Sequence, residues 1–330
     1  MPLYNKAPYV EKAIRSVLAQ TFQEFELIVV DDGSKDNSLE ICHGVLNASV
    51  RRGVLNTPIL HTPEICDFQI IEQQNAGVST ARNNGVKIAR YEYVAFLDAD
   101  DWWESTFLEE MKKLIIDFPE AAMYASSYFI VKNGNHKIAP VALSPNFESG
   151  HIDYIKTYAE RLCMPIWTGA VILRKNIFNE MQGFKSQLKL GEDFDLWLRI
   201  ALNYKVAFLN KPLAYYNQDV ELQNRAIGKV YDIKHNYLWE MDYLAEEEAK
   251  NKDLKKVLDG IRVTSVYMYF LSDKYREQAR EILNKVDWSS QSPELYKRYY
   301  QTPIWWQKFK FINTQYLLSI KNRIIKHIRK

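Results

Sequence analysis

Hydrophobic residues in the first 120 positions follow two alternating patterns. Short continuous apolar runs alternate with longer segments in which apolar residues recur every three or four positions. The runs are typical of buried strands, and the spaced segments are typical of helices. In chain order the segments are 10–18, 26–30, 68–71, 78–88, 93–97 and 107–115, of which the second, third and fifth are the apolar runs. This order predicts an α/β domain with a mostly parallel sheet flanked by helices.

The pattern changes near residue 218. Downstream of it the strand signals fade, and helical patterns rich in Lys, Glu, Tyr and Leu take over. We therefore expect an α/β domain over 1–218 and a helical region over 219–330. Residues 43–67 contain Gly53, Pro58 and Pro63, and we expect them to form a loop-rich insertion.

Composition is that of an ordinary globular protein, with 47% apolar and 25% charged residues. The net charge of +2 is unevenly distributed, because residues 305–330 hold seven Lys or Arg and no acid. The remainder has 36 basic against 41 acidic residues. Cys42, Cys66 and Cys163 lack CxxC spacing, which favours a reducing compartment and disfavours a zinc site. Neither a run of 18 apolar residues nor a signal-peptide pattern is visible, so the expected location is the cytoplasm.

Acidic clusters follow two of the predicted strands. Asp31-Asp32 ends the first apolar run, and Asp98-Ala99-Asp100-Asp101 ends the third. In parallel sheets, ligands bind in the crevice beyond the carboxyl ends of the strands. Three carboxylates in four residues repel one another unless a cation neutralises them, and hard oxygen ligands suit Mg²⁺ or Mn²⁺. The plain alternative is a solvated turn that precedes a helix.

Other candidate residues also have plain alternatives. Tyr4 can stack on a nucleobase or anchor a loop. Arg82, on a predicted helix, can reach a phosphate or form a structural ion pair with Asp98. Glu192 and Asp193 lie in the first turn of a predicted helix, where the helix dipole favours acids whatever their function. A carboxylate in that position can also take a proton from a substrate hydroxyl.

Together these residues resemble family 2 of the inverting glycosyltransferases, whose members have the GT-A fold. The order and spacing of the matching segments agree over roughly residues 2–215. The segments are Pro2-Leu3-Tyr4-Asn5, SVLAQT at 16–21, VVDDGS at 29–34, NAGVS at 75–79 with Arg82-Asn83, FLDADD at 96–101 and Gly191-Glu192-Asp193. Each motif alone is weak, but their order along one chain is a strong signal.

The resemblance implies a role for each residue. Asp193 would be the catalytic base of a single displacement with inversion, and Glu192 is its nearest rival. Asp100 would bind a divalent metal, Mn²⁺ or Mg²⁺, that bridges the diphosphate of the donor. The residues implied in nucleotide binding are Pro2, Tyr4, Asp32, Asn75, Arg82, Asp98 and Ala99.

The implied donor is a nucleoside-diphosphate sugar, with a UDP-sugar expected because the Asp32 carboxylate can accept the N3–H of uracil. The implied acceptor is a glycan or a lipid-linked molecule in cell-surface polysaccharide or lipopolysaccharide synthesis. Trp167, Thr168 and Gly169 are candidates to line the acceptor side, or they simply pack in the core. The Gln-x-x-Arg-Trp motif of processive members is not present, which favours transfer of one sugar.

The chain also departs from the family pattern. An apolar strand normally precedes the Tyr-Asn pair, whereas this sequence begins at Met1-Pro2. We expect that strand to be missing here and the natural N-terminus to lie upstream of Met1. Two rival functions are a nucleotidyltransferase-like enzyme and a non-catalytic nucleotide- or glycan-binding relic. The first usually needs a basic Gly-rich loop that we do not find, and retention of both Asp100 and Asp193 disfavours the second.

The C-terminal residues 305–330 predict a basic amphipathic helix. One helical stripe holds Trp305, Phe309, Ile312, Tyr316, Ile320, Ile324 and Ile328. Such a helix is typical of a peripheral binder on the cytoplasmic face of a membrane. The alternative is a helix packed on the catalytic domain with a basic exposed face. We expect no nucleic-acid partner, since the rest of the chain is slightly acidic.

Overall fold

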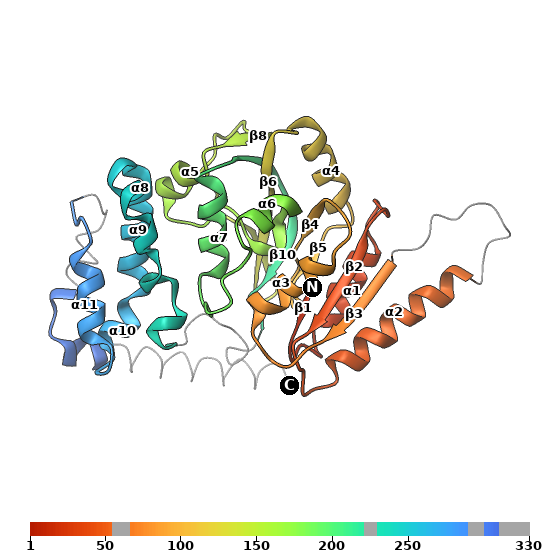
Figure 1. Cartoon of the computed structure of the whole chain (residues 1–330), viewed down its shortest axis with the longest axis horizontal. Coiled ribbons are helices and arrows are strands. Elements are labelled where there is room, and N and C mark those ends of the chain that lie inside the picture. The colour runs from red at the N-terminus through yellow and green to blue at the C-terminus, as the bar shows by residue number, and fades with distance from the viewer. Residues whose placement is uncertain (55–66, 221–229, 290–299, 310–330) are drawn as a thin grey trace. The chain divides into compact units, whose positions relative to one another are not determined.

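A computed structural model describes residues 1–54, 67–220, 230–289 and 300–309 of the chain. The chain divides into two compact units, Met1–Tyr237 and Leu238–Lys330. The first unit contains the strands and the second consists of helices and turns in its described part (Figure 1). The division therefore falls downstream of residue 218, where the strand patterns fade in the sequence.

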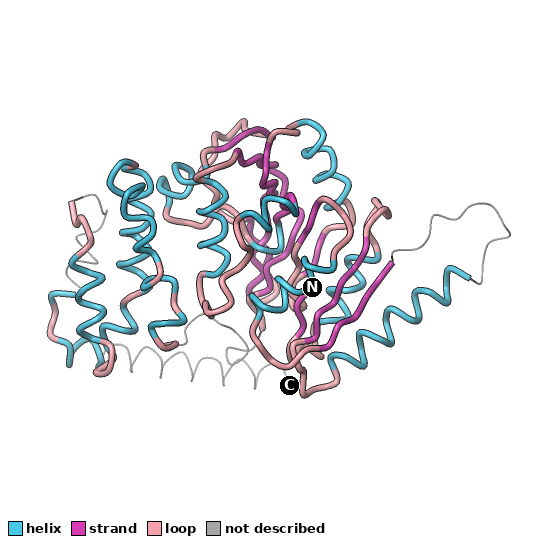
Figure 2. The backbone as a smooth tube through the Cα atoms, in the orientation of Figure 1, coloured by secondary structure: helices cyan, strands magenta, loops and turns pink. Residues whose placement is uncertain are grey.

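The first sheet of the N-terminal unit is parallel and has the order β1-β2-β3. Its strands are β1 (Pro2–Leu3), β2 (Glu26–Asp31) and β3 (Asp67–Glu72), drawn side by side in Figure 2. The first strand, which we expected to be missing, is represented by the two residues of β1. They pair with Val30 and Asp31 of β2.

Helices cover both faces of this sheet, as the alternation of strands and helices predicted. Side chains of a strand point alternately to its two faces. Leu27 and Val29 of β2 belong to a core that includes α1 (Val10–Leu18) and α2 (Ser38–Val54). Ile28 and Val30 instead pack with Ala81 of α3 (Val78–Ile88).

The predicted loop-rich insertion over 43–67 is wrong for its first part. Residues 43–54 continue α2, and residues 55–66 lie outside the described part of the chain. Cys42, Val45 and Leu46 are buried at helical spacing, which the prediction overlooked because it relied on glycine and proline as breakers. Gly53 itself lies within the helix, near its end.

The second sheet of the same unit has the order β4-β9-β6-β10-β5, with β7 added to β6 and β8 added to β10. Strands β6 and β10 are parallel, whereas the other neighbours are antiparallel. Parallel pairing is thus concentrated in the first sheet and in this central pair. The strands are β4 (Tyr93–Ala95), β5 (Trp102–Trp103), β6 (Ala121–Lys132), β7 (Asn135–Ile138), β8 (Ser149–Ile152), β9 (Val171–Arg174) and β10 (Lys205–Asn217).

The N-terminal unit contains further helices, of which the first and the last lie where the sequence predicted a helix. They are α4 (Phe107–Asp117), α5 (Tyr154–Arg161), α6 (Lys175–Glu180) and α7 (Glu192–Ala201), with a short 3₁₀ turn η1 (Thr168–Ala170) before β9. In the C-terminal unit the helices are α8 (Ala245–Lys250), α9 (Lys252–Ser265), α10 (Tyr267–Leu271) and α11 (Arg276–Asn284). None of the helices in the described ranges has the length and apolarity needed to cross a bilayer.

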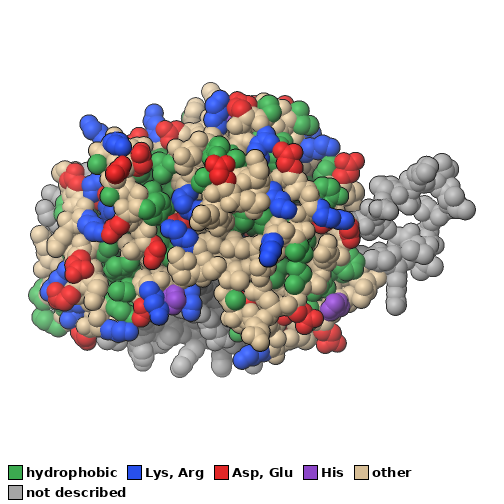
Figure 3. All heavy atoms as spheres, in the orientation of Figure 1, with side chains coloured by type: hydrophobic (Ala, Val, Ile, Leu, Met, Phe, Trp, Pro, Cys, Tyr) green, Lys and Arg blue, Asp and Glu red, His purple; other side chains and the backbone are tan. Residues whose placement is uncertain are grey.

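Basic and acidic side chains are interspersed over the visible face of the described residues (Figure 3).

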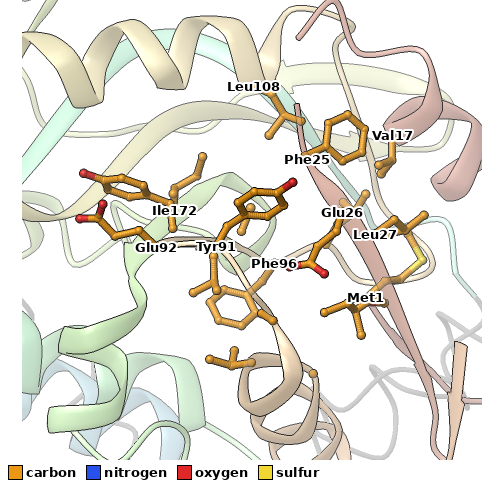
Figure 4. Close-up of a pocket in the computed structure, with 18 of the residues that line it drawn as sticks. Met1, Val17, Phe25, Glu26, Leu27, Tyr91, Glu92, Phe96, Leu108 and Ile172 are labelled. Atoms are coloured by element: carbon orange, nitrogen blue, oxygen red, sulfur yellow. Dashed lines mark hydrogen bonds between the residues drawn. The ribbon is translucent and has the colours of Figure 1, made fainter. Parts of the chain in front are cut away.

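An apolar cavity of about 490 Å³ lies between β2 of the first sheet and β4 of the second. Leu27 borders it on β2, and Phe96 follows β4 into its wall (Figure 4). Met1 lies at the same cavity, and its amino group donates to the Ile28 carbonyl at 2.8 Å. The acidic turn 98–101 does not line this space. Arg82 lines the cavity as well, so this space reaches the cluster of candidate site residues at that side chain.

Candidate active site

The acidic turn 98–101 connects β4 to β5 on the second sheet. The Asp101 amide donates to the Asp98 carbonyl at 3.0 Å, which closes the turn. Ala99 and Asp101 are buried, whereas Asp98 and Asp100 are partly exposed. Two of the three carboxylates therefore remain accessible to neighbouring charges and to a ligand.

Arg82 joins the acidic turn to α7. Its guanidinium lies 2.7 Å from Asp98 Oδ1 and 3.1 Å from Glu192 Oε1, and its side chain is only 4% exposed. Burial alone would lower the pKa of this group, but the two carboxylates reverse that and raise it. Arg82 therefore adopts the ion-paired state that the sequence left open as an alternative. Its Nε is buried without a hydrogen-bond partner.

Asp100 has a different partner. Lys6, in the loop after β1, places its Nζ 2.5 Å from Asp100 Oδ2, and both side chains are 17% exposed. Burial raises the pKa of the Asp100 carboxyl, and the Lys6 ammonium opposes that shift. Lys6 could not be selected from the sequence, because a contact across 94 positions leaves no trace in local spacing.

The sequence suggested no role for Asp101, and the structure shows that its carboxylate links two neighbouring segments by hydrogen bonds. Its Oδ1 accepts from the Asn217 amide at 2.8 Å, and its Oδ2 accepts from Trp167 Nε1 at 3.1 Å. Burial raises the pKa of this carboxyl well above its usual value. Asp101 thus fixes the acidic turn to the end of β10 and to the segment before η1.

Glu192 and Asp193 begin α7, as their spacing predicted. Gly191 precedes them with a φ of 81°, and a Cβ at this position would lie 1.9 Å from Cδ1 of Tyr237. Only glycine fits this approach without displacing the ring. The start of α7 is thereby set by a residue that also belongs to the sequence motif.

The two acids of α7 differ in their contacts. Glu192 Oε1 is paired with Arg82, whereas Asp193 Oδ2 accepts from Thr168 Oγ1 at 3.1 Å. Burial, reinforced by the charge of Asp193 and opposed by Arg82, raises the pKa of Glu192 from 4.5 to about 7. Burial also raises the pKa of Asp193, and Arg82 opposes this shift as well. Such paired, perturbed carboxyls are common at catalytic sites.

The three candidate acceptor residues lie on the same side as these acids. Thr168 contacts Asp193, and Trp167 contacts Asp101. The Gly169 carbonyl accepts from Trp103 Nε1 at 2.6 Å. Thr168 and Gly169 are buried, while Trp167 is partly exposed. Of the three, Trp167 therefore has the side chain that a ligand can contact.

The candidate nucleoside residues form a second cluster. Asp32 Oδ1 accepts from the Ala76 amide at 2.7 Å, and its Oδ2 accepts from the Gly77 amide at 2.9 Å. The Asp32 carbonyl accepts from Asn75 Nδ2 at 3.0 Å. The carboxylate thus holds the turn before α3, and Tyr4 stands 41% exposed. Pro2 contributes through its place in β1. Lys6 connects this N-terminal loop to the acidic turn.

The donor atoms of the acidic turn fit a metal only in a limited way. Groups of three or more His, Cys, Asp or Glu able to hold a metal are not found in the described ranges. Arg82 already occupies Asp98, so Asp100 is the carboxylate left for a cation. Mg²⁺ commonly uses one or two carboxylates and completes its shell with water and substrate phosphates. Asp100 fits that kind of site if the Lys6 ammonium moves away from its carboxylate.

Comparison with known proteins identifies the family. The family model described as "Glycosyl transferase family 2" matches residues 1–178. Glycosyltransferase GlyA of Streptococcus pneumoniae is 29% identical over 224 residues, which are 66% of this chain and 30% of that protein. Glycosyltransferase GlyG of the same organism is 23% identical over 282 residues, covering 82% of this chain and 84% of that protein.

The fold has a counterpart among solved structures. Residues 1–349 of TarS from S. aureus, crystallised in complex with UDP-GlcNAc, superpose with a TM-score of 0.66 at 20% identity. The match covers 86% of this chain and 78% of the other. The family and the GT-A-like α/β fold expected from the sequence are both confirmed. The family model matches more than half of the length of this chain. The chain therefore belongs to glycosyl transferase family 2 and is a glycosyltransferase.

Proposed function

We propose that this chain is an inverting transferase that moves one sugar from a UDP-sugar to a glycan or lipid-linked acceptor in cell-surface polysaccharide synthesis. The observation that carries the proposal is the bridge made by Arg82. It holds the acidic turn, through Asp98, beside the first turn of α7, through Glu192. Asp98, implied in donor binding, and Glu192, a candidate base, therefore belong to one cluster of side chains. The complex of TarS with UDP-GlcNAc supports a uridine donor.

Asp193 is the better placed of the two candidate bases. Glu192 Oε1 is already engaged by the Arg82 guanidinium, so that oxygen is not available to a substrate hydroxyl. Asp193 is held by the neutral hydroxyl of Thr168 and keeps acceptor capacity on its oxygens. Asp193 would deprotonate the acceptor hydroxyl as it attacks the anomeric carbon, a contribution typically worth about 10²–10⁴-fold in rate.

The remaining residues bind and orient the donor. Tyr4 offers an exposed ring to the base. The Asp32 carboxylate accepts from Gln73 Nε2 at 2.8 Å as well as from the Ala76 and Gly77 amides, which leaves it about one further acceptor position. Asp100 would hold Mn²⁺ or Mg²⁺ when that ion is bound, and the ion supplies charge neutralisation for the leaving diphosphate. Asp98 keeps Arg82 directed toward the same region.

Two variants test this assignment. Asp100→Ala should abolish transfer and remove the metal dependence of UDP binding, because the only carboxylate assigned to the cation is lost. Asp193→Asn should abolish transfer but leave UDP binding intact, because shape and donor site are kept. Asp117→Asn, an exposed acid at the end of α4, is the matched control. Turnover within twofold of wild type in both site variants would refute the proposal.

We also propose that the enzyme works at an anionic membrane surface on the cytoplasmic side. Most of the predicted basic helix, residues 310–330, lies outside the described part of the chain. Its described beginning supports the idea, because Trp305 and Phe309 are 70% and 54% exposed. Gln307 is buried and Lys308 pairs with Asp273 at 2.9 Å, so the segment is held with its aromatic side outward. Exposed aromatics next to six further cations suit a lipid headgroup region.

A further inference from the structure

Lys6 lies beside Asp100 and has no part in the proposed mechanism. Its ammonium lies 2.5 Å from Asp100 Oδ2, on the one carboxylate assigned to the metal. With both side chains 17% exposed, the pair is shielded from bulk water far more than an ordinary surface ion pair. Lys6 is therefore the counter-cation of Asp100 when no donor is bound.

The backbone around Lys6 is fixed, whereas its side chain has a long flexible stem. The Lys6 amide donates to Ser38 Oγ at 2.7 Å, and its carbonyl accepts from the Tyr9 and Val10 amides at the start of α1. The neighbouring Asn5 has a φ of 51° and accepts from the Lys35 amide at 2.8 Å. The ammonium can thus leave Asp100 by rotating its four-carbon stem, without any movement of the loop.

Two cations cannot share Asp100 without repulsion. A metal at the usual distance of about 2.1 Å from a carboxylate oxygen would lie within a few ångströms of the ammonium. The nearby Asp98 carboxylate cannot accept the displaced ammonium freely, because Arg82 already occupies it. A donor diphosphate arriving with the metal would offer the ammonium new anionic oxygens.

We propose that Lys6 is a competing cation which holds Asp100 until the donor arrives and then moves to the donor's diphosphate. The proposal rests on the metal role of Asp100 given above. It makes metal and donor binding synergistic: the ion binds weakly alone, because it must displace Lys6 into water, and tightly together with a nucleoside diphosphate. Lys6 is then a positioning residue for the donor and sets the order in which ion and nucleotide are taken up.

The test is calorimetric titration of the full chain with MnCl₂, alone and in the presence of saturating UDP. In Lys6→Gln, the affinity for Mn²⁺ without UDP should rise about tenfold or more. The gain in Mn²⁺ affinity that UDP provides should shrink by a similar factor. Lys35→Gln removes a charge from the facing, exposed loop position and should leave both affinities unchanged. Lys6→Arg keeps the charge and should retain weak binding of the ion alone.

The outcomes separate this inference from the proposed function. If Lys6→Gln binds Mn²⁺ as weakly as wild type while UDP still promotes Mn²⁺ binding in both, the role of Lys6 is wrong and the metal site stands. If wild type binds no Mn²⁺ even with UDP, the metal role of Asp100 is wrong, and this inference falls with it. Equal effects of Lys6→Gln and Lys35→Gln would show a general change of surface charge and would also overturn the proposal.

Discussion

The raised pKa of Glu192 leads to a prediction about stability and pH. The folded carboxyl keeps its proton up to a pH of about 7, whereas its ordinary pKa is 4.5. Between these values the folded state binds more protons than the unfolded state, so stability falls as pH rises. Each pH unit in that window contributes about 1.4 kcal/mol, so the group costs roughly 3 kcal/mol by pH 7.5.

The perturbation is Glu192→Gln, which keeps the shape and stays neutral at every pH. At pH 4.5 the ionisation of Glu192 should contribute little to the difference in unfolding free energy between variant and wild type, since the wild-type carboxyl is protonated in the folded state. By pH 7.5 the variant should have gained roughly 3 kcal/mol relative to wild type. Asp100 and Asp101 also have raised pKa values, but Glu192 is not among the causes of those shifts, so their contributions cancel in the difference. Asp193 interacts with Glu192, and the change in its own pKa is part of the measured difference.

The assay is urea unfolding followed by tryptophan fluorescence at several pH values between 4.5 and 8. Glu160→Gln, on an exposed position of α5, is the control and should parallel wild type throughout. A difference between Glu192→Gln and wild type that stays constant with pH would refute the reasoning. A variant that instead loses stability as pH rises would show that the ion pair with Arg82 outweighs the burial of Glu192.

The remaining predictions concern two glycines and the aromatic segment. Gly85→Ala in α3 should stabilise the protein by about 0.5–1 kcal/mol in calorimetry, because the interior of the helix tolerates a Cβ lying 3.4 Å from its nearest neighbour atom. The same exchange at Gly191 should destabilise it by at least about 2 kcal/mol, since the Cβ would collide with Tyr237; equal melting temperatures for the two variants would contradict both. Trp305→Ser should weaken sedimentation with phosphatidylglycerol vesicles severalfold, whereas Tyr243→Ser, at another exposed aromatic, should not. Undiminished vesicle binding by Trp305→Ser would count against the membrane proposal.

The sequence predicted those parts of the fold that depend on local spacing. The apolar run before Asp98 and the helix predicted to begin at Glu192 and Asp193 placed β4 and α7 correctly, because burial imposes a period on each element. The length of α2 was missed, because its buried residues Cys42 and Leu46 were outweighed by the breakers that follow.

The sequence placed the candidate acids but not their partners. Family motifs select Asp98, Asp100 and Asp193, the positions to which the resemblance assigns roles. The contacts of Lys6 with Asp100 and of Trp167 with Asp101 join residues 94 and 66 positions apart. Such pairings depend on how the sheets and loops are folded against one another, and no local pattern records them. They emerge only from three-dimensional structure.

The candidate donor-binding residues belong to two separate segments of the N-terminal unit, and this placement has a consequence for the protein when no donor is bound. The Asp32 cluster lies on the first sheet, and the acidic turn lies on the second. A donor held by both would act as a brace between them. Its binding free energy would then add to folding, by about 2.7 kcal/mol at a hundred times its dissociation constant. Cells short of donor would accordingly hold less of this enzyme in its folded, protease-resistant form.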